Sequence, residues 1–144
     1  RGKLEEAAAM RVSDLMTTDV LAMMPDETVE DLDRLMRDRN VRHVPIVDRD
    51  GDLLGVVSHR DLLRHALIEQ QDVPDDVAKA VLERVRVRDV MIPEPITIEA
   101  EADLRAAAQL LWDHKVGCLP VVEGRRLIGI LTESDFVRLM AEGD

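Results

Sequence analysis

Apolar residues fall at helical spacing in two parts of the chain, and two short apolar runs follow each part. The pattern at 29–40 recurs every three or four residues, which predicts an amphipathic helix ending near Asn40. The runs at 44–48 and 53–57 flank an Asp-Gly turn and predict a β-hairpin. A second helix is expected at 58–70, directly after the hairpin.

The second half of the chain repeats this pattern. We expect a helix at 104–114, strands at 119–122 and 127–131 around a tight turn, and a helix from Thr132 onward. Short extended pieces at 20–23 and 96–98 open the two copies, and a connector helix is expected from Val77 to Val85. Each copy therefore reads strand, helix, strand, strand, helix.

The copies also share sequence at a constant spacing. Val12-Ser-Asp-Leu-Met16 matches Val87-Arg-Asp-Val-Met91, and Gly55-Val-Val-Ser-His-Arg-Asp61 matches Gly129-Ile-Leu-Thr-Glu-Ser-Asp135.

At 144 residues we expect one domain, or two small halves that share one core. The expected division is an N-terminal segment or helix (1–11), repeat 1 (12–70), a helical connector (71–86) and repeat 2 (87–141).

Charge and composition exclude several classes of partner. The formal net charge is −11, and Trp112 and Phe136 are the only aromatic residues, so neither phosphate-backbone binding nor base stacking is expected. No apolar run is long enough for a signal peptide or a membrane span. Cys118 is the only cysteine and cannot form an intramolecular disulfide, which favours the cytoplasm.

The repeated Gly-x-x-Ser/Thr-x-x-Asp motif lies where a strand passes into a helix. Ser58 and Thr132 can cap the helix, and the first-turn amides then form an anion site. Asp61 and Asp135 lie in the first helical turn, where a carboxylate can accept both hydroxyls of a ribose. The alternative is a capping box, in which the third residue of the helix bonds back to the cap.

Three motif pieces, repeated twice in order, resemble a tandem of CBS domains, often called a Bateman module. They are Val-x-Asp-hydrophobic-Met, Val-x-x-hydrophobic-Pro-hydrophobic-Val at 41–47 and 116–122, and the Gly-x-x-Ser/Thr-x-x-Asp motif. The resemblance implies an α/β (α+β) fold of two CBS repeats related by a pseudo-twofold. It also implies a regulatory homodimer that binds an adenine nucleotide, without catalytic activity, in two clefts between the repeats.

Carried over residue by residue, the resemblance assigns two sets of ligand-binding residues. The first cleft would use Val56, Ser58, Arg60, Asp61, Ile92, Ile96, Thr97, Val116, Cys118 and Arg42. The second cleft would use Thr17, Leu21, Ala22, Val41, His43, Ile130, Thr132, Ser134 and Asp135. In a chain with almost no aromatic residues, aliphatic side chains would hold the adenine.

The copies differ in charge near the two motifs. Arg42, His43, His59 and Arg60 accompany Asp61, whereas the matching positions of repeat 2 are Gly117, Cys118, Glu133 and Ser134. We therefore expect the Asp61 cleft to accept more phosphate charge. The other cleft is expected to favour a less charged adenosyl compound or to stay empty.

Other chemistry is not favoured by the spacing. Ser58, His59 and Asp61 have the residue types of a hydrolase triad, but neighbours at one helix start do not align as a triad does. No His or Cys pair has metal-ligand spacing, so neither a catalytic nor a metal site is expected.

Trp112 is expected to pack or to form a dimer contact, and the arginines at 34–42 to form a solvated face near the cleft mouth.

Two other functions stay open. The chain could be a dimerisation or interaction module of a larger protein with vacant clefts, or it could bind S-adenosylmethionine. The protein that it would regulate is not identified by the sequence.

Overall fold

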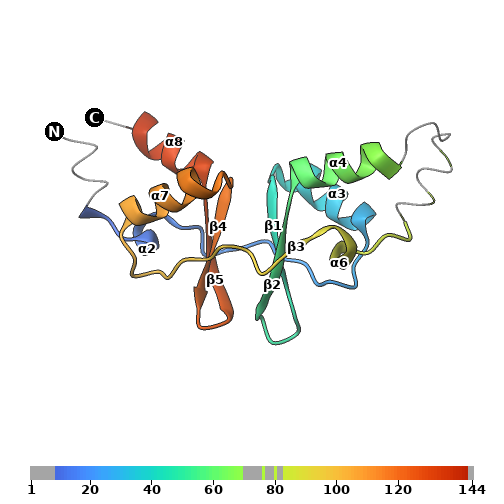
Figure 1. The fold of residues 1–144 in the computed structure, drawn as a ribbon, viewed down its shortest axis with the longest axis horizontal. Helices are drawn as coiled ribbons and strands as arrows, with labels where there is room; N and C mark the ends of the chain where they lie inside the picture. Colours follow the sequence, from blue (N-terminus) through green and yellow to red (C-terminus); the bar gives the residue numbers. More distant parts are fainter. Residues whose placement is uncertain (1–8, 70–75, 77–79, 81–82, 143–144) are drawn as a thin grey trace. The chain divides into compact units, whose positions relative to one another are not determined.

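The computed structural model describes residues 9–69, 76, 80 and 83–142, and the chain divides into two compact units. Unit 1 contains Arg1–Val20 and Pro95–Asp144, and unit 2 contains Leu21–Glu94 (Figure 1). Each unit therefore contains most of one sequence repeat and the first residues of the other. We call these first residues the opening segments, 12–20 in repeat 1 and 87–94 in repeat 2.

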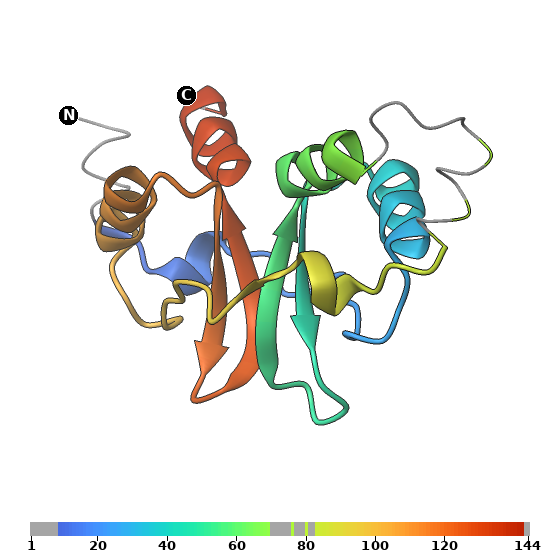
Figure 2. The same cartoon turned by 45° about the vertical axis from the view of Figure 1, so that its right-hand side comes forward.

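The described part of unit 2 packs helices α3, α4 and α6 against an antiparallel sheet of order β1-β2-β3 (Figures 1 and 2). Its β1–β2 pair is the predicted hairpin, with His43 opposite Ser58 at its open end. An isolated parallel bridge joins Met23 to Ile46 on the other side of β1. The elements are α3 (Val29–Arg39), β1 (His43–Val47), β2 (Leu53–Ser58), α4 (His59–Glu69), α6 (Val87–Val90) and β3 (Ile92–Pro93).

Unit 1 has the same layout. Its hairpin pairs Cys118 with Thr132 at the open end, an antiparallel bridge joins Thr17 to Ile130, and a parallel bridge joins Ile98 to Val121. The elements are α2 (Val12–Leu15), α7 (Leu104–His114), β4 (Cys118–Glu123), β5 (Arg126–Thr132) and α8 (Glu133–Ala141). Asn40 and Lys115 end α3 and α7 in the left-handed conformation.

The described residues form two hydrophobic core clusters, one in each unit, instead of the single shared core expected from chain length. Val12, from repeat 1, is fully buried in the unit 1 cluster, beside Leu119 and Leu131 of repeat 2. Val87, from repeat 2, is fully buried in the unit 2 cluster with Val44 and Val57 of repeat 1. The opening segments are thus exchanged, so each core is completed by the other repeat.

Matching hydrogen bonds hold the exchanged segments. In unit 1 the backbone N–H of Val12 donates to the carbonyl of Ala102 (2.9 Å), and in unit 2 that of Val87 donates to Glu27 (2.8 Å). Thr17 and Ile130 each donate an N–H to the other's carbonyl, both at 2.9 Å. This repeated pattern explains the Val-x-Asp-hydrophobic-Met motif as a docking segment.

The predicted helices and hairpins are confirmed, with boundaries within one or two residues. The short helices α2 and α6 were not predicted, and the extended pieces at 20–23 and 96–98 contribute single bridges at Met23 and Ile98. Most of the predicted connector helix lies outside the described residues, as do residues 1–8 and Gln70. Among the described helices, none has the length and apolar character needed to span a membrane.

Trp112 is not a core residue, because 71% of it is exposed on α7. The ammonium of Lys115 lies 3.9 Å from the centroid of its ring, close enough for a cation–π interaction. The packing role expected for Trp112 is therefore wrong within its own chain, and the dimer contact stays a prediction.

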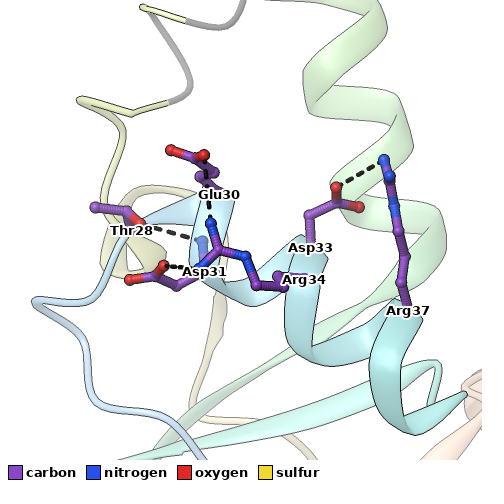
Figure 3. A network of polar contacts seen from close by, with 6 residues as sticks. All are labelled: Thr28, Glu30, Asp31, Asp33, Arg34 and Arg37. Atoms are coloured by element: carbon purple, nitrogen blue, oxygen red, sulfur yellow. Dashed lines mark hydrogen bonds and ion pairs between the residues drawn. The ribbon is translucent and has the colours of Figure 1, made fainter.

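Helix α3 carries its own ion pairs (Figure 3). Arg34 contacts Glu30 at 3.5 Å and Asp31 at 3.4 Å, while Arg37 contacts Asp33 at 2.8 Å. Both arginines are exposed, which confirms the solvated helix face. Since acids of the same helix neutralise them, they add little positive charge to their surroundings.

Thr28 caps α3, and we expect Thr28→Ala to lower the free energy of unfolding by about 1 kcal/mol. Its hydroxyl oxygen accepts from the Asp31 amide at 3.1 Å, and alanine leaves this helix-end donor without its partner. Urea unfolding measures the change. Thr18→Ala removes a hydroxyl from an exposed threonine and is expected to change stability by less than about 0.5 kcal/mol. Equal effects of the two substitutions would contradict the capping role.

Candidate functional site

The motif at the start of α4 brings Ser58 and Asp61 into direct contact. The Asp61 amide donates to Oγ of Ser58 at 3.0 Å, and the Ser58 amide donates to Oδ2 of Asp61 at 3.3 Å. This reciprocal pair is a capping box. Among the described residues nothing bonds to Oδ1 of Asp61, and both side chains are only half-buried.

The matching motif at the start of α8 is also a capping box, but its carboxylate has more partners. Oδ2 of Asp135 accepts from the Thr132 amide at 2.8 Å and from the Thr132 hydroxyl at 3.2 Å. Oδ1 accepts from the guanidinium of Arg138 at 3.1 Å. Asp135 is buried, with 5% of the residue exposed.

The capping interpretation is therefore confirmed as geometry in both repeats. Half of this geometry recurs at α2 and α6, where the amides of Arg11 and Arg86 donate to Asp14 (2.8 Å) and Asp89 (3.1 Å), while an arginine side chain cannot accept a bond in return. Those aspartates were not assigned a capping role from the sequence, although each stands two residues after the valine that opens its motif. Capping alone does not exclude ligand binding, because a carboxylate has about four acceptor positions.

Unit 2 brings part of the first predicted cleft together. Val56 and Ile92 are register partners in β2 and β3, and Ile92 is 48% exposed. The amide of His59 donates to the carbonyl of Arg42 at 2.7 Å, which holds Arg42 next to the start of α4. Unit 2 contains Arg42, Val56, Ser58, Arg60, Asp61 and Ile92 of this set, and also Leu21, Ala22, Val41 and His43 of the second set.

Unit 1 brings together the matching part of the second predicted cleft. Thr17 is bonded to Ile130, Thr132 is bonded to Asp135, and Ser134 is exposed in the first turn of α8. Unit 1 contains Thr17, Ile130, Thr132, Ser134 and Asp135 of this set, and also Ile96, Thr97, Val116 and Cys118 of the first set. Each predicted cleft thus draws residues from both units, and its assembly stays a prediction.

The strand register adds a relation that the sequence did not predict. His43 lies opposite Ser58, and Cys118 lies opposite Thr132, so each hairpin end joins residues assigned to different clefts. Sequence periodicity could not reveal this, because register depends on the bulges between Ile46 and Val47 and between Val121 and Val122.

Charge differs between the two helix starts as expected. Arg42 and Arg60 are both exposed beside the start of α4, and among the described residues neither forms an ion pair. At the start of α8, Glu133 and Ser134 are exposed instead. Among the described residues, no hydrogen bond joins the His59 ring to Ser58 or Asp61, and no three potential metal ligands gather there.

These features define the chain as a tandem repeat of a small helix-and-sheet domain with a capped acidic helix start in each copy. A family model for the CBS domain matches residues 12–68 and 87–142. The chain therefore belongs to the CBS-domain family, and the resemblance identified from its motifs is confirmed, as is the mixed helix-and-sheet fold class.

Two solved structures are similar along almost the whole chain. CBSX2, crystallised in complex with AMP, is 32% identical, with a TM-score of 0.76 and coverage of 93% of this chain and 98% of that one. The AcuB protein of Vibrio cholerae, named for acetoin utilization, is 35% identical, with a TM-score of 0.78 and coverage of 92% and 90%. Inosine-5'-monophosphate dehydrogenase of Mycobacterium tuberculosis is 34% identical over 85% of this chain, which spans only 21% of that enzyme.

Proposed function

We propose that the chain is a non-catalytic regulatory module that binds an adenine nucleotide of the AMP, ADP or ATP type in clefts between its CBS repeats. The observation that carries the proposal is the carboxylate of Asp61 at the start of α4, whose Oδ1 receives no hydrogen bond from any residue that the structure describes. Arg42 and Arg60 are exposed near the same helix start and are suited to a phosphate group. The AMP complex of the similar CBSX2 supports this ligand class.

In the proposed mechanism, ligand binding shifts the equilibrium between arrangements of the two repeats. A nucleotide that contacts residues of both units favours the arrangement in which those residues meet, and its differential affinity sets the size of the shift. The proposal retains the two residue sets and the division at 11, 70 and 86 predicted from the sequence. It also includes a homodimer in the cytoplasm that passes the change to a regulated protein.

A second candidate function is a dimerisation or interaction module with empty clefts. Capping alone accounts for Ser58–Asp61 and Thr132–Asp135. In addition, α4 and α8 expose the large apolar side chains of Leu63 (49%), Val137 (68%) and Met140 (49%). Such residues on helices suit contact with another protein.

Thermal unfolding with AMP, ADP, ATP and S-adenosylmethionine distinguishes the two functions. A ligand present at 100 times its Kd stabilises the folded state by about 2.7 kcal/mol, so we expect at least one adenine nucleotide to raise the Tm by several degrees. Inosine 5'-monophosphate, which has the ribose and the phosphate of AMP but not the adenine, serves as the control ligand. If none of the four compounds shifts the Tm at millimolar concentration, the second candidate is favoured and nucleotide binding is rejected.

A further inference from the structure

The two capped aspartates differ in how many acceptor positions remain available. A carboxylate offers about four lone-pair positions to donors. In the part of the chain that the structure describes, three donors reach the Asp135 carboxylate, namely the amide and hydroxyl of Thr132 and the guanidinium of Arg138. About one position is left, whereas the cis-diol of a ribose donates two hydrogen bonds.

The Asp61 carboxylate is much less occupied. Within the described residues, one donor reaches it, the Ser58 amide at 3.3 Å, which leaves about three positions. Arg64 stands at the position that matches Arg138, three residues after the aspartate, but no ion pair between Arg64 and Asp61 is found among the described residues. Asp61 can therefore accept both hydroxyls of a ribose, and Asp135 as it stands cannot.

Arg138 is well placed to occupy Oδ1 of Asp135 reversibly. It lies one helical turn after Asp135 on α8, and its side chain is 54% exposed while that of Asp135 is 7% exposed. The guanidinium can therefore leave the carboxylate for solvent without unfolding the helix. The buried carboxylate, in contrast, keeps its capping bonds to Thr132.

We infer that Arg138 is a specificity-determining residue that competes with a ribose diol for Oδ1 of Asp135. This inference rests on the proposed function. It makes the two nucleotide sites unequal, so that the Asp61 site fills first and the Asp135 site fills only when Arg138 is displaced.

The test uses titration calorimetry of the full chain with AMP. In the background of Asp61→Ala, which removes the tighter site, we expect Arg138→Met to strengthen the remaining binding about tenfold, because one charge-assisted hydrogen bond to the ribose becomes possible. Arg64→Met in the same background is the matched control and is expected to have no such effect. Adding Asp135→Ala to the Arg138→Met variant is expected to abolish the gain.

Titration with adenosine separates the effect of the ribose hydroxyls on binding from that of the phosphate charge, since adenosine has the hydroxyls without a phosphate. A gain with both compounds supports competition for Asp135. Unchanged or weaker binding after Arg138→Met, in variants that unfold cooperatively, overturns this inference alone if the wild type binds AMP. Failure of the wild type to bind any adenine nucleotide overturns the proposed function and this inference with it.

Discussion

Replacing Gly55 by alanine lowers the free energy of unfolding by about 3 kcal/mol, the upper end of the usual cost of overpacking. A Cβ at this position would lie 2.7 Å from the backbone carbonyl oxygen of Ile92 and 2.8 Å from Sδ of Met91. The Met91 side chain can rotate away, but the carbonyl belongs to the exchanged opening segment paired with β2. Relief therefore requires β3 to move, which separates Ile92 from Val56.

Gly129→Ala is the matched control, and we expect it to cost only about 1 kcal/mol. Here the nearest atom is Sδ of Met16 at 2.7 Å, while the Thr17 carbonyl is farther away at 3.1 Å. The flexible end of a methionine can yield more readily than a backbone carbonyl.

Urea unfolding measures the difference in unfolding free energy between the two variants. In thermal unfolding, we expect Gly55→Ala to lower the Tm by roughly 10 °C. A double-mutant cycle sharpens the test. Met16→Ala is expected to offset part of the cost of Gly129→Ala, whereas Met91→Ala leaves most of the Gly55→Ala cost in place. If Gly55→Ala is as mild as Gly129→Ala, the close approach of β3 is not required for stability.

The glycine contacts separate the parts of the fold that could be predicted from neighbouring residues from the parts that could not. Helices α3 and α7 and both hairpins depend on residues close together along the chain, so periodicity and turn residues predicted them. The exchange of opening segments depends instead on Met16 meeting Gly129 and Met91 meeting Gly55, contacts between different repeats. The repeated Gly and Met were visible in the sequence, but their spacing does not show that they touch.

The candidate site shows a similar limit. Sequence reasoning identified the Ser/Thr-x-x-Asp motifs and weighed capping against ligand binding, and capping is present in both. It treated Asp61 and Asp135 as equivalent acceptors. Their difference comes from the arginine one turn later, which bonds to Asp135 although an arginine occupies the matching position in both repeats. The flanking charges predicted clefts of unequal charge preference, but the identical residue types gave no signal that the two carboxylates differ as ribose acceptors.

Asp61→Ala is expected to weaken AMP binding about 100-fold. In the proposed site this carboxylate accepts both ribose hydroxyls, and losing two charge-assisted hydrogen bonds of about 1.5 kcal/mol each removes about 3 kcal/mol of binding free energy. Asp61→Asn retains an amide oxygen that can accept but loses the charge, so its affinity is expected to lie between those of the wild type and Asp61→Ala.

Asp135→Ala is the control that separates capping from binding. It removes a carboxylate with three donors from the start of α8, so it is expected to destabilise the fold at least as much as Asp61→Ala, whose carboxylate has one described donor. Because the Asp61 site is the tighter one and is intact in Asp135→Ala, the affinity of this variant for AMP is expected to differ from that of the wild type by less than about threefold. Calorimetric titration at a temperature where every variant is folded measures both affinities. Loss of AMP binding in Asp135→Ala with retention in Asp61→Ala would reverse the order of the two sites, and parallel losses that follow stability would assign both aspartates to helix capping alone.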